Sequence, residues 1–201
     1  MTVLENKGGR WSDADKDRVA IVPYHPSWPG MFEKEVAAIR QAVPGNIDFT
    51  AVHFGSTAVP GLAAKPIIDI LLLVPERSQW PALVSPLESI GYAFWSANPN
   101  PNRMFFVKGM PPFGTGRTHH VHIREAGDAR DVVVFRDYLR AHPGEAARYE
   151  ALKYELARAY ENDREAYTAA KTGYVDGVLR KARESGFEWT RPSRRNDPQN
   201  G

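Results

Sequence analysis

A single carboxylate, Asp69, interrupts the most hydrophobic run of the sequence. The run extends from Ile67 to Val74, is rich in β-branched residues and is too short to span a membrane. These properties predict a buried β-strand. A charge in a buried strand is costly unless an ionic partner, hydrogen bonds or a metal ion compensate for it. Asp69 is therefore the first candidate for a functional residue.

The motif Gly55-Ser56-Thr57 lies between an earlier predicted strand and the strand of Asp69. Backbone amides at such a junction can hold an anion, and the two hydroxyl groups add donors. The motif is not a Walker A loop, because Lys65 is too far from the glycine and no Gly-Lys-Ser/Thr follows. An ordinary turn explains the motif when it is taken alone. The Asp69 strand that follows it strengthens the interpretation as a phosphate-binding turn.

Strand and helix patterns are mixed in the first part of the chain, and only helices follow. Hydrophobic periodicity predicts strands at residues 47–54, 67–74, 92–95, 103–108 and 118–123. It predicts helices at residues 31–42, 78–91, 131–141, 145–160 and 164–184, with at most one helical turn at 60–64.

This order indicates an α+β protein with a mixed sheet, flanking helices and a helical C-terminal segment. We expect the core at residues 18–128 and a helical region packed on it at 129–186. A flexible segment at 1–17 and a polar tail at 187–201 would flank them.

Composition limits the classes of protein to consider. Hydrophobic residues at 42% and charged residues at 25% are ordinary for a soluble globular protein. The net charge of +2 argues against a broad nucleic-acid surface, and the absence of cysteine excludes disulfides and thiol catalysis. No apolar segment predicts a secretory signal or a membrane span, so we expect a cytoplasmic protein. The sequence does not predict an oligomeric state.

Several longer motifs resemble those of the GrpB family. They are GSTAVPGLAAKPIIDI (residues 55–70), IVPYHPSW (21–28), RTHHVH (117–122) and FRDYLR (135–140). The resemblance extends from about Val19 to about Ala182. It implies the fold of the nucleotidyltransferase superfamily, as in kanamycin nucleotidyltransferase and DNA polymerase beta. GrpB-like domains also occur fused to dephospho-coenzyme A kinase, which suggests an accessory role as a further interpretation.

The superfamily resemblance also implies roles for individual residues. In that superfamily a Gly-Ser pair grips a nucleoside triphosphate, and two carboxylates one residue apart on the next strand hold Mg or Mn. Gly55 and Ser56 match the pair, and Asp69 matches the first carboxylate. The second position is occupied by Leu71, which cannot bind a metal ion. One aspartate is a poor site for two-metal phosphoryl chemistry.

Two histidines could complete the site of Asp69. In an extended strand, His120 and His122 point to the same face. With Asp69 they would form a set of two imidazoles and one carboxylate, which prefers Zn, Ni, Fe or Mn over Mg. The resemblance implies that their strand lies beside the strand of Asp69. Hydrogen-bonded sheet histidines, or substrate contacts without a metal, are the alternative.

Basic side chains are candidates for binding a phosphate or a carboxylate. Lys65 and Arg103 lie closest to the candidate site in the order of the motifs. Lys153 and Lys171 lie on predicted helices, and the resemblance implies that a helical segment closes over the nucleotide and supplies a cation. Exposed helix lysines are the simpler interpretation of these last two.

Two functions follow from these residues. The first is a metal-dependent nucleotidyltransferase-like enzyme, with Asp69 and Lys65 as catalytic residues and with Gly55, Ser56, Thr57, Lys65, Arg103 and Lys153 binding the phosphates of a substrate. The substrate would be a nucleoside triphosphate or another phosphorylated small molecule, with neither a membrane nor a nucleic acid as partner. The second is a protein that binds a metal or ligand through Asp69, His120 and His122 without nucleotidyl transfer.

Overall fold

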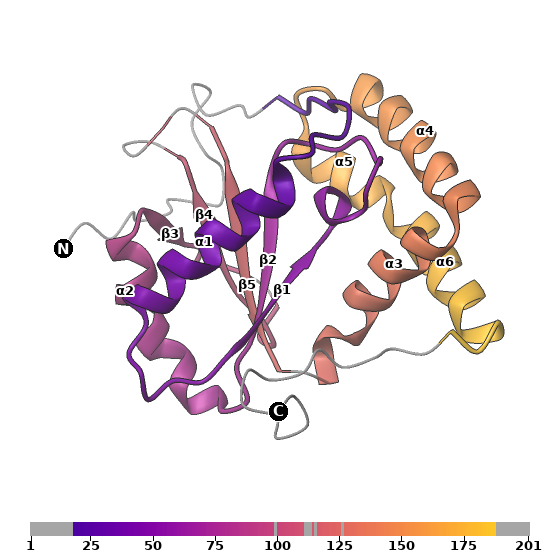
Figure 1. The fold of residues 1–201 in the computed structure, drawn as a ribbon. Helices are drawn as coiled ribbons and strands as arrows, with labels where there is room; N and C mark the ends of the chain where they lie inside the picture. The colour runs from indigo at the N-terminus through magenta and orange to yellow at the C-terminus, as the bar shows by residue number, and fades with distance from the viewer. Residues whose placement is uncertain (1–17, 99, 111–113, 115, 126, 188–201) are drawn as a thin grey trace.

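The computed structural model describes residues 18–187, except 99, 111–113, 115 and 126. The expected flexible segment at 1–17 lies outside the described residues, and so does the expected polar tail apart from Phe187. Figure 1 shows a sheet in the centre of the molecule, with helices beside it.

The sheet has five strands in the order β1-β2-β5-β4-β3. Strands β2 and β5 are parallel, and the other neighbouring pairs are antiparallel. The expected α+β class with a mixed sheet is therefore confirmed. The strands are β1 (Thr50–Phe54), β2 (Ile68–Leu73), β3 (Tyr92–Phe94), β4 (Met104–Lys108) and β5 (His119–Arg124).

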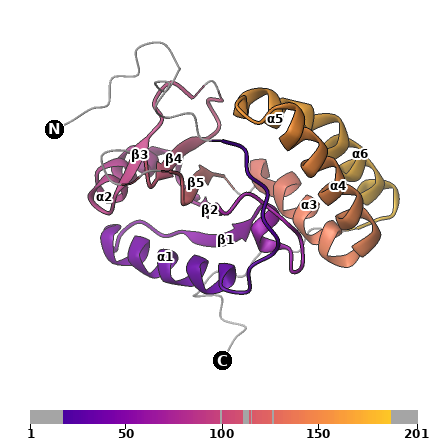
Figure 2. The ribbon, with the colours of Figure 1, turned by 90° about the horizontal axis from the view of Figure 1, so that it is seen from above.

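One face of the sheet is covered by α1 (Trp28–Ala42) and α2 (Val84–Ser89), and Figure 2 shows α1 along that face. Alternate residues of a strand point to opposite faces, so Ile68, Ile70 and Leu72 turn to this side. They join the largest hydrophobic core cluster with residues of α1 and α2. The same alternation turns Asp69 to the opposite face.

The opposite face is occupied by the C-terminal helices, which lie together on that side in Figure 2. Leu71 and Leu73 of β2 pack there with Ala129 and with Val133 of α3 in a second buried cluster. Asp69 therefore lies on the side of the sheet that faces the helical region. The helices are α3 (Arg130–Ala141), α4 (Pro143–Ala159), α5 (Arg164–Ala170) and α6 (Thr172–Glu184).

Three local predictions were wrong in detail. The helix expected at 78–91 is a 3₁₀ helix, Arg77–Leu83, followed by the short α2, because Pro81 lies within it and lacks a backbone donor. The turn expected at 60–64 occurs earlier, as a 3₁₀ helix at Ser56–Ala58. The single helix expected at 164–184 is divided at Lys171, whose amide bonds the carbonyl of Thr168 at 3.4 Å, three residues back.

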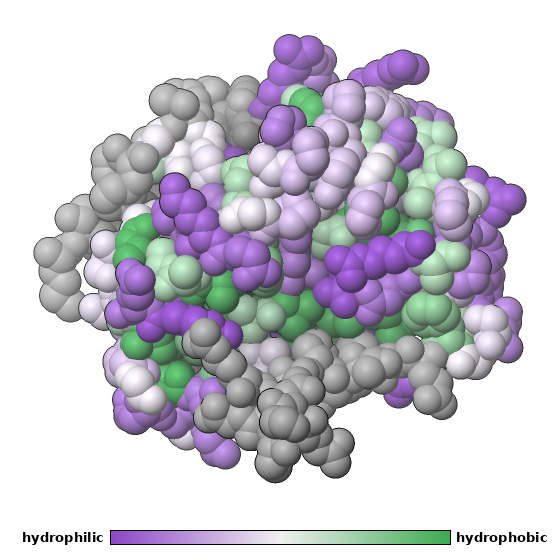
Figure 3. All heavy atoms as spheres, viewed as in Figure 1, coloured by the Kyte–Doolittle hydropathy of each residue, from purple (hydrophilic) through white to green (hydrophobic). Residues whose placement is uncertain are grey.

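On the face shown in Figure 3, hydrophilic residues stand out and hydrophobic ones lie mostly lower between them. Among the described residues, the exposed large hydrophobic side chains are Met31 and Tyr160. No helix in the described ranges has the length and apolar composition needed to cross a bilayer.

Candidate functional site

The pairing of β2 with β5 brings Asp69, His120 and His122 together. In the parallel register Asp69 lies opposite His120, and Leu71 lies opposite His122. All three side chains point to the face of the helical region. One potential ligand atom from each residue lies within 4.8 Å of the other two.

Asp69 and His120 form a hydrogen-bonded pair, with 3.0 Å between Asp69 Oδ1 and His120 Nδ1. Burial alone would raise the pKa of Asp69, but the hydrogen bond and charge of His120 outweigh burial and lower it. The ionised carboxylate accepts, so His120 Nδ1 carries the proton. His120 Nε2 is then a bare lone pair, buried and without a hydrogen-bond partner in the described residues. The hydrogen bond fixes the tautomer of His120, so Nε2 is the nitrogen that His120 can offer to a metal ion.

His122 lies between two aromatic rings. Its ring centroid is 5.0 Å from that of Phe54 and 4.7 Å from that of Phe105. Burial lowers the pKa of His122 well below the usual value, and burial also lowers the pKa of His120. Both imidazoles are therefore neutral at pH 7, which is the state that binds metal ions. The donor set and the orphaned nitrogen fit a single divalent transition-metal ion.

The backbone at Gly55 lies directly against the carboxylate of Asp69. Gly55 has φ +72° and ψ −173°, a conformation that is essentially restricted to glycine. A Cβ at this position would lie 2.4 Å from Asp69 Oδ2. The glycine of the Gly-Ser motif thus permits both the turn and the close approach of the turn to Asp69.

The other two residues of the motif are already engaged. Ser56 interacts with the phenol of Tyr149 on α4 and opposes the burial that raises the pKa of that phenol. Thr57 is buried, and its hydroxyl lies 3.1 Å from His53 Nε2 and donates to the carbonyl of Ile67 at 3.3 Å. The hydroxyl of Thr57 is therefore used to hold the turn, and the structure does not offer it to a phosphate.

Lys65 and Lys171 are neighbours at the site, although 106 positions separate them in the chain. Their Nζ atoms lie 5.0 Å and 4.5 Å from the centre of the Tyr167 ring. Burial, with the charges of Arg164 and Lys171, lowers the pKa of Lys65 to about 7. Burial also lowers the pKa of Lys171, against the charge of Asp69. This group carries more positive than negative charge, which favours an anionic ligand.

Arg103 lies near the histidines, directly before the first residue of β4. Its Nη2 donates to Asn98 Oδ1 at 3.0 Å, and its guanidinium lies 5.3 Å from the centre of the Phe105 ring. Its charge helps to lower the pKa of His122. Arg103 therefore contributes to the positive field at the histidine side of the site.

Lys153 has a different environment from the one expected. Its side chain is buried, its Nζ donates to the carbonyl of Ala63 and it lies 5.0 Å from the centre of the Tyr149 ring. Burial lowers the pKa of Lys153 to about 7. The ammonium is thus directed at the protein backbone, where it holds the loop that precedes β2.

Leu71 occupies a position that the fold uses for packing. It is fully buried, in contact with Val52 of β1 and with Val133 of α3 in the second core cluster. The position at which the sequence resemblance implies a second carboxylate is part of an apolar interface here. An ion could not be held at this position without opening that interface.

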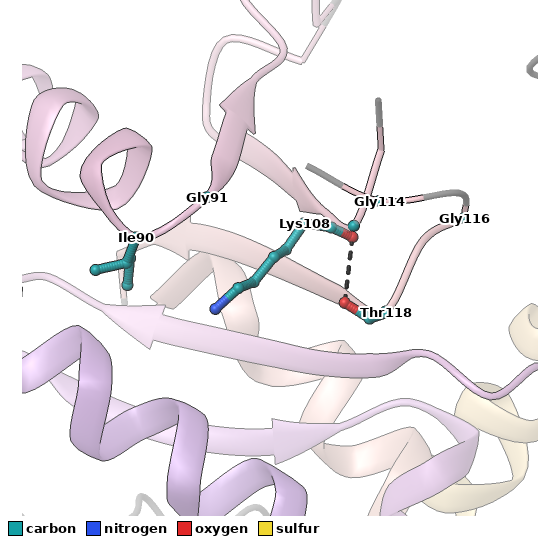
Figure 4. Close-up of a pocket in the computed structure, with 7 residues that line it drawn as sticks. Ile90, Gly91, Lys108, Gly114, Gly116 and Thr118 are labelled. Atoms are coloured by element: carbon teal, nitrogen blue, oxygen red, sulfur yellow. Dashed lines mark hydrogen bonds between the residues drawn. The ribbon is translucent and has the colours of Figure 1, made fainter. Parts of the chain in front are cut away.

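A cavity of about 470 Å³ lies away from these residues (Figure 4). Its lining includes Ile90, Lys108 and Thr118, and Thr118 Oγ1 donates to the carbonyl of Lys108 at 3.4 Å. Lys108 Nζ is bound to Glu35 Oε1 of α1 at 2.7 Å. None of the site residues predicted from the sequence lines this cavity.

The comparisons with known proteins agree with the motifs. A family model described as "GrpB protein" matches residues 18–181. The chain belongs to the GrpB family. UPF0157 protein PA4798 of Pseudomonas aeruginosa is 54% identical over 87% of this chain and 72% of its own length. The crystal structure of the conserved protein GrpB from Enterococcus faecalis has a TM-score of 0.75 and 34% identity, over 84% of this chain and all of that one.

Two further similarities are more distant. Dephospho-CoA kinase of Mycolicibacterium paratuberculosis is 30% identical over 82% of this GrpB-family chain, which spans 46% of that enzyme. The structure of Cid1 in complex with its short product ApU has 13% identity and a TM-score of 0.49, over 77% of this chain and 48% of that one.

Two features of the site are not predicted by the sequence: the position of Lys171 and the contact of Gly55 with Asp69. Lys171 resembles an exposed helix lysine in the sequence, and only the tertiary structure places it at the Tyr167 ring with Lys65. The contact of Gly55 with Asp69 was also not expected, although a glycine directly before Ser56 is a signal of close backbone approach.

Proposed function

We propose that this GrpB-family protein binds a phosphorylated small molecule, such as a nucleotide, beside one divalent transition-metal ion held by Asp69, His120 and His122. The observation that carries the proposal is the cluster of three ligand atoms within 4.8 Å of one another. When bound, the ion would supply a Lewis acid next to the phosphate. A set with two imidazoles favours Zn, Ni or Fe over Mg.

The chain's own residues define the rest of the binding site. Lys65 and Lys171 supply positive charge beside Asp69, and their lowered pKa values reflect the cost of holding buried cations close together. A phosphate dianion would relieve that cost and return a full positive charge to Lys65. The aromatic rings of Phe54 and Phe105 enclose His122 and reduce its access to water.

The chemical class of the ligand is the next part of the proposal. Dephospho-CoA kinase, of which this chain spans 46%, acts by its name on dephospho-CoA. The net charge of +2 gives no reason to expect a nucleic acid. A nucleotide or a nucleotide-like cofactor precursor is the ligand class that we propose.

The metal site is tested by elemental analysis of protein purified without added metal, followed by calorimetric titration of chelator-treated protein with Zn²⁺, Mn²⁺ and Mg²⁺. We expect about one transition-metal ion per chain, and at least about tenfold weaker binding in His120→Ala and His122→Ala. His119→Ala is the matched control, because His119 is on the same strand but faces α1. Equal Zn²⁺ affinity in His122→Ala and His119→Ala would contradict the proposal.

Nucleotidyl transfer is the second candidate, and the contact between Gly55 and Asp69 favours it. It places the Gly-Ser turn directly beside a carboxylate, as the superfamily resemblance implies. In this function Asp69 would bind the ion and Lys65 would hold the phosphates. Release of pyrophosphate from nucleoside triphosphates with Mg²⁺ or Mn²⁺, abolished in Asp69→Ala, would support it. Metal binding without any pyrophosphate release would leave only the first candidate.

A further inference from the structure

Helix α3 carries the motif FRDYLR (residues 135–140), to which the proposed function assigns no role. Its two arginines donate hydrogen bonds to backbone carbonyls of residues 53–64, which we call the Gly-Ser loop. Arg136 Nη1 donates to the carbonyl of His53 at 2.6 Å. Arg140 Nε and Nη2 both donate to the carbonyl of Ala58, at 3.0 and 2.7 Å.

Asp137, between the two arginines, orients both of them. Arg136 Nε and Nη2 bind its two carboxylate oxygens at 2.7 and 2.8 Å. Arg140 Nη1 binds Asp137 Oδ1 at 3.2 Å. Each guanidinium therefore uses some of its N–H groups on Asp137 and the others on the loop. Only the planar fork of arginine can make both sets of bonds at once.

Helix α4 holds the other end of the Gly-Ser loop in the same way. The amide of Ala63 donates to Glu150 Oε2 at 2.6 Å, and Lys153 Nζ donates to the carbonyl of Ala63. Both backbone groups of one residue are thus bound by charged side chains one helical turn apart. Hydrogen bonds to charged groups are about twice as strong as neutral ones.

The loop needs these bonds because its own backbone bonds are few. Within it, the amides of Ala58, Val59 and Leu62 donate to carbonyls three residues back, at 3.1 to 3.2 Å. Such 3₁₀ bonds have poorer geometry than those of an α-helix. Without the side chains of α3 and α4, several buried carbonyls would lack partners, which destabilises a closed loop.

We infer that Arg136, Arg140 and Lys153 are positioning residues, which bind the Gly-Ser loop by its carbonyl groups and keep Gly55 against Asp69. The importance of this arrangement for ligand binding rests on the proposed function. The arrangement itself does not depend on any ligand. It also explains why Lys153, expected to bind phosphate, is buried against the backbone.

The first test measures hydrogen exchange of loop amides in the full chain without added metal. In Arg140→Lys one ammonium on a shorter side chain replaces the three guanidinium nitrogens that bind Asp137 and the carbonyl of Ala58, so exchange at Ala58 and Val59 should be about tenfold faster. Arg148→Lys is the matched control, since Arg148 instead binds Glu145 within α4, at 2.6 Å. Equal exchange in the two variants would overturn the inference.

The second end of the loop provides an independent variant. Glu150→Ala removes the acceptor of the Ala63 amide and should speed its exchange by a similar factor. Glu150→Gln keeps an acceptor oxygen and should restore most of the protection. Failure of glutamine to protect more than alanine would also overturn the inference.

The third measurement relates the loop to ligand binding, with inorganic pyrophosphate as the probe and Zn²⁺-loaded protein. Arg140→Lys should bind pyrophosphate about tenfold more weakly than Arg148→Lys. Its Zn²⁺ affinity should be unchanged, since the metal ligands lie on β2 and β5. Faster exchange with unchanged pyrophosphate affinity would reject the positioning role. A wild-type protein that binds neither Zn²⁺ nor pyrophosphate would reject the proposed function, and the exchange data would still decide how the loop is held.

Discussion

Substitution of Gly55 by alanine tests the contact on which the site depends. Gly55 has φ +72°, and an added Cβ would lie 2.4 Å from Asp69 Oδ2 and 3.1 Å from its Cγ. Backbone in this conformation costs a residue with a side chain about 1–3 kcal/mol. The overlap cannot persist, so the carboxylate of Asp69 must move away from its present position.

Movement of Asp69 breaks its hydrogen bond to His120, which has a length of 3.0 Å. The side chain of Asp69 is 27% exposed, so solvent compensates for part of this loss, and we assign it about 1 kcal/mol. The free energy of unfolding of Gly55→Ala should therefore fall by about 2–4 kcal/mol. Urea denaturation of chelator-treated protein measures this change.

Gly61→Ala separates the two contributions. Gly61 has φ +79°, but an added Cβ would meet nothing within 4 Å, so only backbone strain is expected. Gly55→Ala should be less stable than Gly61→Ala by about 1 kcal/mol, and most of this excess should disappear in an Asp69→Ala background. Equal losses in the two glycine variants, unchanged by Asp69→Ala, would refute the reasoning.

Two further predictions concern buried groups. Lys153 has a pKa of about 7 in the folded chain and an ordinary value of 10.5 when unfolded. The unfolded state therefore binds more protons between these values, so the free energy of unfolding should rise with pH by up to about 1.4 kcal/mol per unit. Lys153→Met should reduce that slope in denaturant curves at pH 7 to 10, and parallel curves would contradict the lowered pKa. Leu71→Asp, which introduces the second carboxylate that the sequence resemblance implies, should destabilise the fold by about 3–5 kcal/mol because it places an unpaired charge against Val133. If Leu71→Asp were instead as stable as the wild type in urea denaturation and bound Mg²⁺ more tightly, the apolar interface would be able to open.

Much of the local structure follows from sequence patterns. The hydrophobic run around Asp69 predicts β2, and the alternation in RTHHVH places His120 and His122 on one face of β5. Breaks are predicted less well, because the effect of Pro81 and the division at Lys171 depend on competition between short-range bonds. The motifs also identify the GrpB family, since they specify side chains in a fixed order.

Sequence alone does not determine which groups meet across the chain. The sequence around Lys153 is typical of an exposed helix lysine. However, α4 packs so that the ammonium of Lys153 reaches the carbonyl of Ala63. Lys65 and Lys171 meet at the ring of Tyr167 because α5 packs against the loop that precedes β2. Such contacts depend on how helices pack on the sheet, which no local pattern encodes.

The sequence by itself determined that Asp69 lies in a buried strand after a glycine turn, because hydrophobicity and turn propensity act over a few residues. The tertiary structure alone decided what surrounds that carboxylate. The parallel register of β2 and β5 sets His120 beside it, and the packing of α3 surrounds Leu71 with apolar side chains. Both depend on contacts between residues about 50 or more positions apart, whose geometry is set when the sheet and the helices pack together.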